Sequence, residues 1–148
     1  MIAVGRLRPA CRDLADDYIR RIGRFGKLQE RECREAGKAS TIEAGRRQEA
    51  TRLRGLVAPG SIVVALDRAG EPWTSETLAR RLDEWRTAGR PVSLLLGGSH
   101  GLDPALVDGC DGRWSLGPLT LPHELARVIV YEQLYRGFTI LHRTPYHK

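Results

Sequence analysis

Two short apolar runs constrain the fold of this chain most strongly. Ile62-Val63-Val64-Ala65-Leu66 and Val92-Ser93-Leu94-Leu95-Leu96 lack the regular polar alternation of a strand with one wet face. Such strands are buried on both sides, which is typical of a parallel sheet between two layers of helices. Strand-like runs alternate with helical patterns along all 148 residues, without repeats or low-complexity linkers. We therefore expect an α/β fold in which residues 1–148 form a single domain.

The segment between these runs has the signals of a helix with defined ends. Thr74 is suited to the N-cap, and Trp73 and Leu78 have the spacing of a hydrophobic staple. Gly89 provides the C-terminal stop. Further strands are predicted at Ile2–Val4, Leu28–Cys33 and Arg113–Leu116, and the polar Leu28–Cys33 is suited to a sheet edge. Further helices are predicted around Leu14–Ile22, at Pro104–Asp108 and from Pro122 through Leu141. Another helix begins at the S-x-x-E capping box Ser40–Glu43 and continues through Leu56.

The last helix is apolar on more than one face. One helical stripe is expected to face the core and comprises Leu121, Leu125, Val128, Tyr135, Phe138 and Leu141. Further apolar positions extend around the cylinder, namely Ile129, Val130, Tyr131 and Leu134. A second apolar face on a terminal helix of a small chain predicts a partner subunit, and hence a homodimer.

Charge and composition limit the class of partner. The net charge is +6 and the pI is about 9.7, a balance that favours polyanions such as nucleic acid. No apolar run is long enough for a membrane span, and Arg6 and Arg8 follow the first apolar residues, so we expect a cytoplasmic protein without membrane contact. The three cysteines form no C-x-x-C pair and the four histidines form no H-E-x-x-H motif, so we expect free thiols and no metal.

Two glycine-containing turns are candidate ligand-binding segments. Gly97–Gly101 follows a buried strand, at the sheet edge where open α/β folds bind ligands. Its G-G-x-x-G order matches neither the dinucleotide fingerprint nor the P-loop, which disfavours nicotinamide cofactors and ATP. The turn Leu116–Leu121 has the apolar side chains and free backbone groups to hold a flat heterocycle. A tight turn at the first segment and core-filling leucines at the second are the plain structural alternatives.

The C-terminal third carries a series of motifs in fixed order: Leu94-Leu95-Leu96-Gly97-Gly98-Ser99-His100-Gly101-Leu102, Trp114-Ser115-Leu116, Leu119-Thr120-Leu121-Pro122-His123, Arg127-Val128, Glu132-Gln133-Leu134-Tyr135-Arg136 and Pro145-Tyr146-His147-Lys148. Together with Ala3-Val4-Gly5 at the start, this series resembles the RlmH family of SPOUT-class methyltransferases. Members of that family methylate N3 of a pseudouridine in large-subunit (23S) ribosomal RNA. The resemblance covers essentially the whole chain.

The resemblance implies a SPOUT fold with a C-terminal trefoil knot, a dimer formed through the terminal helices, and the ribosome as partner. It also implies S-adenosyl-L-methionine as cofactor, bound by Leu66, Gly97, Leu116, Gly117, Pro118, Leu119, Thr120 and Leu121. By the same resemblance, Tyr146 and His147 contact the target base and Arg136 belongs to a shared active site. N3 of pseudouridine is a weakly acidic imide, so a nearby group must accept its proton or stabilise its anion. His147 is a candidate for that role, and positioning of the nucleotide is the alternative.

Several charged residues have two interpretations. Arg127 and Arg136 either grip RNA phosphates or pair with Glu124 and Glu132 one turn away. His123 contacts the cofactor loop, contacts the partner subunit, or has only a structural role. The face with Arg20, Arg21, Arg24 and Lys27 is either an RNA-docking patch or ordinary solvated surface.

Two other functions remain open from the sequence. A related SPOUT enzyme that acts on transfer RNA would share the cofactor, and a non-catalytic RNA-binding or ribosome-assembly protein would have no affinity for it.

Overall fold

A computed structural model describes residues 1–148, which form a five-stranded parallel sheet flanked by helices. The strands are β1 (Ile2–Val4), β2 (Arg31–Cys33), β3 (Ile62–Pro72), β4 (Val92–Leu96) and β5 (Gly112–Ser115), and the helices are α1 (Pro9–Ile22), α2 (Ile42–Leu56), α3 (Ser75–Ala88), α4 (Pro104–Asp108) and α5 (His123–Leu141). Every strand pairing is parallel, in the order β2-β1-β4-β3-β5. The α/β prediction is confirmed, and so is the position of the polar strand β2 at an edge.

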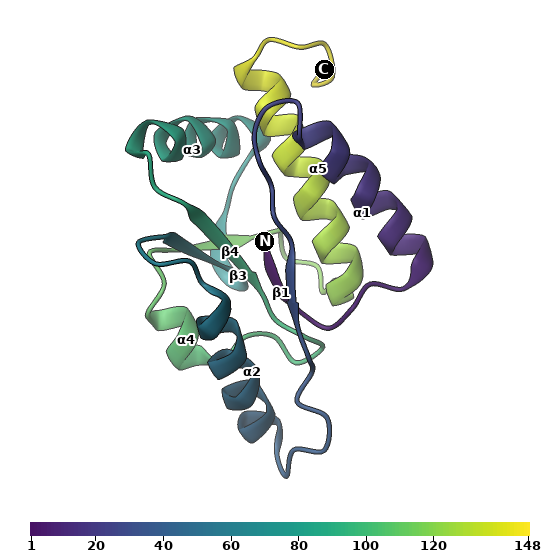
Figure 1. The fold of residues 1–148 in the computed structure, drawn as a ribbon, viewed down its shortest axis with the longest axis vertical. Helices are drawn as coiled ribbons and strands as arrows, with labels where there is room; N and C mark the ends of the chain where they lie inside the picture. Colours follow the sequence, from purple (N-terminus) through teal and green to yellow (C-terminus); the bar gives the residue numbers. More distant parts are fainter.

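Side chains from the two faces of the sheet pack into two separate cores. Ala3, Val64 and Leu94 belong to a cluster with residues of α1, α3 and α5. Val4 and Leu95 belong to a cluster with residues of α2 and α4. Figure 1 shows α1 and α5 side by side, with α2 and α4 at the other end of the molecule. The expectation that β3 and β4 are buried on both faces is therefore correct.

The predicted cap residues are correct for α3 and displaced by one residue for α2. Thr74 accepts a hydrogen bond from the backbone N–H of Thr77, and Gly89 ends α3 with a φ of +63°. At α2, Thr41 rather than Ser40 is the N-cap, and its hydroxyl accepts from Ala44 N at 3.1 Å. Serine and threonine have the same capping chemistry, so the pattern alone does not choose between neighbours.

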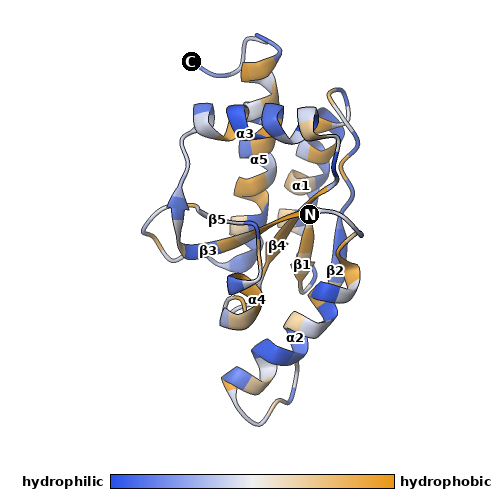
Figure 2. Ribbon diagram, turned by 90° about the vertical axis from the view of Figure 1, so that its left-hand side faces the viewer, coloured by the Kyte–Doolittle hydropathy of each residue, from blue (hydrophilic) through white to orange (hydrophobic).

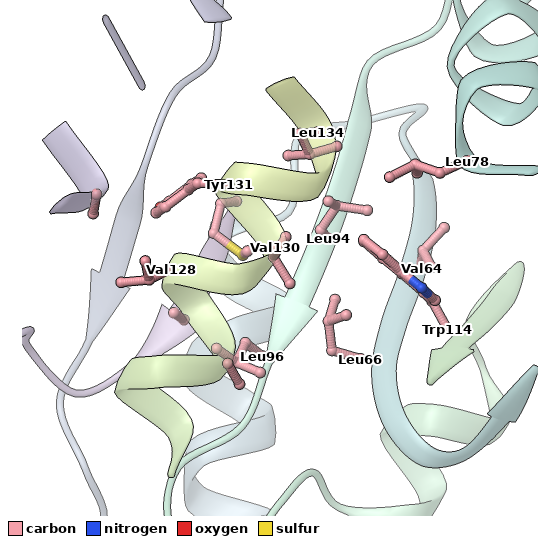
Figure 3. Packing of buried hydrophobic residues seen from close by; sticks show 14 of the residues in the cluster. Val64, Leu66, Leu78, Leu94, Leu96, Trp114, Val128, Val130, Tyr131 and Leu134 are labelled. Carbon is pink, nitrogen blue, oxygen red and sulfur yellow. The ribbon is translucent and has the colours of Figure 1, made fainter. Parts of the chain in front are cut away.

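The predicted faces of α5 are wrong in part. Val130 and Tyr131 are fully buried and Leu134 is nearly so, whereas Leu125, assigned to the core stripe, is 43% exposed. Figure 3 shows Val130, Tyr131 and Leu134 among the core side chains, with Leu94 and Leu96 of β4 close by. The reason is that α5 packs on the sheet and also between α1 and α3, so its own chain covers most of its circumference.

No helix has the combination of length and apolarity that a membrane crossing requires. The cysteines Cys11, Cys33 and Cys110 are unpaired.

Candidate functional site

A large cavity lies at the carboxyl ends of the central strands, where parallel sheets commonly bind ligands. Its volume is about 490 Å³. Three segments from distant parts of the sequence form its walls: residues 66–69 at the bend of β3, residues 98–102 after β4, and residues 119–121 before α5. The topology, rather than any local motif, brings these segments together.

An irregularity in β3 forms the first wall. The pairing with β5 shifts between Leu66 and Glu71, so both residues lie opposite Trp114 and the four residues between them leave the ladder. Asp67 closes this excursion by accepting a hydrogen bond from Ala69 N at 2.7 Å. The strand predicted from the sequence ends at Leu66, because the polar residues that follow do not have a strand pattern. The excursion turns Asp67, Arg68 and Ala69 toward the cavity.

The glycine loop closes by direct backbone contact. A Cβ at Gly97 would lie 2.5 Å from the carbonyl carbon of Gly101, so no other residue fits there without movement of the backbone. Gly101 N donates to Gly98 O at 3.0 Å, and Gly101 has a φ of +76°. Gly97 itself is buried and does not line the cavity, whereas Gly98 and Gly101 do. The role of Gly97 is therefore to let the loop fold back on itself.

The turn before α5 divides between two cavities. Leu119, Thr120 and Leu121 line the large cavity, opposite Leu66. Their backbone N–H groups donate no hydrogen bond within the chain, which leaves them available to a ligand. The remaining predicted cofactor residues do not line this cavity: Leu116 and Gly117 line a smaller one of about 230 Å³, together with Trp73 and Trp114, and Pro118 lines neither.

Charged side chains that sequence analysis did not single out also line the large cavity. Arg46 of α2 donates from Nε to the carbonyl oxygen of His100 at 2.7 Å. Arg113 forms an ion pair with Asp108 across the cavity wall. Asp108 and Arg113 are close in the sequence, whereas Arg46 on α2 is 54 residues from His100 and is brought to the cavity only by the fold. No group of three or more His, Cys, Asp or Glu side chains is arranged to hold a metal.

Residues of the C-terminal tail cluster on α5. Tyr146 donates its hydroxyl to Glu132 Oε1 at 3.0 Å, and Arg136 donates to the same oxygen at 2.6 Å. The predicted Arg136–Glu132 pair is thus confirmed. The guanidinium of Arg136 lies 4.8 Å from the centroid of the Tyr146 ring. Burial, aided by hydrogen bonds to Tyr18 and Glu132, raises the pKa of Tyr146 well above its usual range.

His147 lies beside the same cluster, with its Nε2 3.0 Å from Glu76 Oε1 at the start of α3. The structure therefore brings the three predicted catalytic residues, Arg136, Tyr146 and His147, onto one surface of α3 and α5. None of them lines the large cavity. His123 also lies outside it, next to Gly5 at the end of β1.

The cavity lies at the start of α5, whereas the tail cluster lies along its second half. The cavity includes Leu121, two residues before the helix begins, whereas the tail follows its last residue, Leu141. A helix of 19 residues is roughly 28 Å long. In Figure 1 the C-terminus lies beyond the far end of α5, away from the carboxyl ends of the strands. The tail folds back to Glu132, near the middle of α5, which is roughly 16 Å along the helix from Leu121.

Arg127 is buried completely and does not contact Glu124, so the predicted pair is wrong. Its guanidinium donates to Glu32 at 2.6 Å and to the carbonyl oxygen of Gly5 at 2.8 Å. Glu124 instead accepts hydrogen bonds from the backbone N–H and the side chain of Arg8. Because Arg127 points inward over the end of β1, it is also unable to reach RNA phosphates.

Comparisons with known proteins agree with this architecture. The sequence model of the family described as "Predicted SPOUT methyltransferase" matches residues 1–147. Two curated relatives are named ribosomal RNA large subunit methyltransferase H. The relative from Pseudomonas paraeruginosa is 41% identical, and the match covers all of this chain and 97% of the relative. The relative from Nitrosococcus oceani is 42% identical over all of this chain and 96% of its own length.

A solved structure supports the fold. It is titled as a probable methylase family protein from Haemophilus influenzae, and it aligns with a TM-score of 0.54 and 12% identity over 99% of this chain and 69% of that one. The parallel sheet, the cavity at its carboxyl edge and the full-length family match lead to one conclusion. The chain belongs to the SPOUT methyltransferase family.

Proposed function

We propose that this chain is an S-adenosyl-L-methionine-dependent methyltransferase that modifies N3 of a pseudouridine in 23S ribosomal RNA. In this proposal residues 1–148 form one catalytic domain, which acts in the cytoplasm as a homodimer on assembled ribosomes. The observation that carries the proposal is the large cavity at the sheet edge, in a chain that matches ribosomal RNA large subunit methyltransferases over their full length. The net charge of +6 is suited to an RNA substrate.

The residues of the large cavity fit S-adenosylmethionine. A volume of about 490 Å³ lies within the range of roughly 300–1,000 Å³ typical of small-molecule sites. Leu66, Leu119 and Leu121 offer aliphatic contacts for a flat base, and the unused N–H groups of residues 119–121 offer hydrogen bonds to its edge. When bound, the cofactor supplies an electrophilic sulfonium methyl group. The chain's part is to hold it in one orientation and to exclude water.

The tail cluster supports a division of roles between Tyr146 and His147. Tyr146 already donates its hydroxyl to Glu132, and its pKa is raised above the usual value, so it is unsuited to act as the base. His147 remains the candidate to accept the N3 proton. Its contact with Glu76 holds the imidazole in one place, which also suits the alternative role of positioning the nucleotide.

The separation of cavity and tail supports a shared active site. Since Arg136, Tyr146 and His147 do not line the cavity of their own chain, we expect the tail of a second copy to complete the site. Leu119 and Leu125 near the start of α5 are 76% and 43% exposed, which supports a subunit contact there. The trefoil knot that the resemblance implies belongs to the same proposal.

The proposal is tested by methyl transfer from labelled S-adenosylmethionine to four substrates: intact ribosomes, large subunits, free 23S RNA and transfer RNA. We expect one methyl group per large-subunit RNA, on N3 of a pseudouridine by mass spectrometry, with intact ribosomes the best substrate. Labelled transfer RNA would favour the related SPOUT activity instead. A chain that binds no cofactor in a calorimetric titration would be a non-catalytic RNA-binding protein.

Mixed dimers test the shared site. One chain lacks Pro145–Lys148, and the other carries Thr120→Trp to fill the cavity; each is expected to be inactive alone. Random mixing makes half of the dimers mixed, each with one complete site, so about a quarter of full activity should return. No recovery in a mixture that forms mixed dimers would refute a tail that acts on the partner's cavity.

A further inference from the structure

Among the five helices, only α2 has more basic than acidic side chains. α2 carries four arginines and only two glutamates. α1, α3 and α5 each carry equal numbers of acidic and basic side chains, and α4 carries a single aspartate. α2 is therefore the one helix with a net positive charge, and it contributes two of the six net positive charges of the chain, four arginines minus two glutamates.

The arginines around α2 are bonded to backbone carbonyls rather than to carboxylates. Arg46 donates to His100 O at 2.7 Å, Arg52 to Arg34 O at 2.8 Å, Arg54 to Ala105 O at 3.2 Å and Arg31 to Leu56 O at 3.2 Å. Arg47 is exposed, and its side chain makes no hydrogen bond within the chain. A carbonyl fixes the position of a guanidinium without neutralising its charge. Arg31, Arg46, Arg52 and Arg54 are therefore ordered cations with donors to spare, and Arg47 is an exposed cation beside them.

The glutamates of α2 form no salt bridge with these arginines, although backbone and Thr41 hydrogen bonds and the charges of Arg46 and Arg47 lower the pKa of Glu43. Glu49 is partly buried, and its Oε1 accepts from the backbone N–H of Ala36 at 2.9 Å. Glu43 lies in the first turn, beside the capping Thr41. By contrast, Arg20 on α1 is paired with Asp17, and Arg86 on α3 with Asp83. The two sets of arginines therefore differ in available charge, although both are exposed.

This basic surface continues into the large cavity. Arg46 belongs to both, and its partner His100 is in the glycine loop. Arg54 bonds to α4, which contributes Pro104, Val107 and Asp108 to the cavity wall. Figure 2 shows α2 in hydrophilic colours over much of its length, at the end of the molecule opposite the C-terminus.

We propose that the α2 surface, formed by Arg31, Arg46, Arg47, Arg52 and Arg54, is the docking site for the RNA sugar-phosphate backbone. This inference deepens the proposed function and depends on RNA being the substrate. Ordered guanidiniums form charge-assisted and often bidentate bonds with phosphate, and each neutralised phosphate releases counterions. Because Arg46 also lines the large cavity, RNA bound to this surface would extend to the cavity proposed to hold the methyl donor.

The test compares two charge-matched variants. Arg47→Gln with Arg54→Gln removes two cations from the α2 surface, and Arg20→Gln with Arg86→Gln removes two cations already paired with carboxylates. The probe is large-subunit ribosomal RNA, and its binding constant is measured over a series of salt concentrations. Losing two phosphate contacts should lower the slope of log K against log salt by about 1.4–1.8, or roughly 20-fold in affinity at 0.15 M salt. The control pair should retain the original slope.

A third variant, Arg47→Lys with Arg54→Lys, keeps the charge and should restore most of the slope, which separates lost charge from lost structure. Cofactor affinity should be the same in all variants, because neither position lines the cavity. If the glutamine pair on α2 behaves like the control pair, the docking site is refuted. Since binding is measured without methyl transfer, absence of transfer by the unaltered chain would overturn the proposed function alone.

Discussion

The substitution Gly97→Ala tests the close approach on which the glycine loop depends. The added Cβ would lie 2.5 Å from Gly101 C, 2.7 Å from Gly101 O and 2.7 Å from Leu102 N. Carbon atoms in contact normally lie ~3.5–4.0 Å apart, so the overlap with the backbone is about 1 Å. These are main-chain atoms, which are unable to rotate away as a side chain would. The loop must move or the fold must carry the strain.

The expected change in the free energy of unfolding is the sum of two opposing effects. Overpacking of this kind costs about 1–3 kcal/mol, and the stiffer unfolded chain returns about 0.4–1 kcal/mol. We expect a net loss of about 1–2 kcal/mol in the free energy of unfolding, which lowers Tm by about 2–8 °C in a chain of this size. Because Gly98 and Gly101 line the cavity, any movement of the loop also weakens cofactor binding; a tenfold loss corresponds to about 1.4 kcal/mol.

Thermal unfolding by circular dichroism and calorimetric titration with S-adenosylmethionine measure the two effects. Gly55→Ala is the matched control, because Gly55 lies inside α2 with no atom within 4 Å of the added Cβ. It should stabilise the protein by about 0.5–1 kcal/mol and leave cofactor binding unchanged. If Gly97→Ala melts at the original Tm and binds the cofactor as well as the unaltered chain, the tight loop described above is incorrect.

Three further substitutions probe the core and the subunit contact. Arg127→Met leaves Glu32 and the Gly5 carbonyl without their buried donor, so denaturant unfolding should show a loss of about 3–5 kcal/mol; a loss below about 1 kcal/mol would contradict a buried ion pair. Burial disfavours ionised Glu30, but hydrogen bonds from Tyr131 and Arg12 outweigh it and keep the pKa of Glu30 below its usual value. A carboxyl group with a lowered pKa stabilises the folded state at pH values above its pKa in the unfolded chain, which is about 4.3. This stability is lost as the pH falls through the pKa of the folded state. In Glu30→Gln the free energy of unfolding should therefore decrease less between about pH 5 and 3 than in the unaltered chain. Leu125→Glu, at an exposed apolar position, should convert dimers to monomers in sedimentation analysis and leave the monomer's stability within about 0.5 kcal/mol; an unchanged dimer would move the contact elsewhere.

Local signals predicted the elements of this fold well. Thr74 and Gly89 mark the ends of α3 because capping depends only on neighbouring backbone groups. β4 was found with its observed boundaries, because a run of aliphatic residues buried on both faces has few other solutions. The signals failed where a strand continues through polar residues, as β3 does beyond Leu66.

The surroundings of α5 were not predictable from its periodicity. A helical stripe shows that a face is apolar, and it does not say which neighbour covers that face. Here α1 and α3 cover sides of α5 that seemed to require a second subunit, and Leu125 was left outside. Arg127 was misassigned for the same reason. Its partner Glu32 is distant in the sequence and becomes a neighbour only through the β1–β2 pairing.

The candidate site, too, could be predicted from the sequence only in part. The residue pattern predicted that the glycine loop and the turn before α5 bind a ligand, and the family resemblance added Leu66. All three segments line one cavity. Which residues of that turn face the cavity depends on Gly117, whose φ of +111° redirects the chain between Leu116 and Leu119. No residue pattern encodes that direction.

The length of α5 links the two halves of the proposed active site. Contacts of Tyr146 with Glu132 and of His147 with Glu76 fix the tail to its own helices, so the distance from the tail to its own cavity is set by the helix and not by a flexible linker. In a two-fold symmetric pair whose α5 helices run antiparallel, that same length carries each tail toward the start of the partner's α5, where the partner's cavity lies. In such a dimer, the side chains of one subunit recognise the base and the backbone of the other binds the cofactor, so one arrangement of the two subunits determines both functions. A change in the length of α5 would disturb both sites at once.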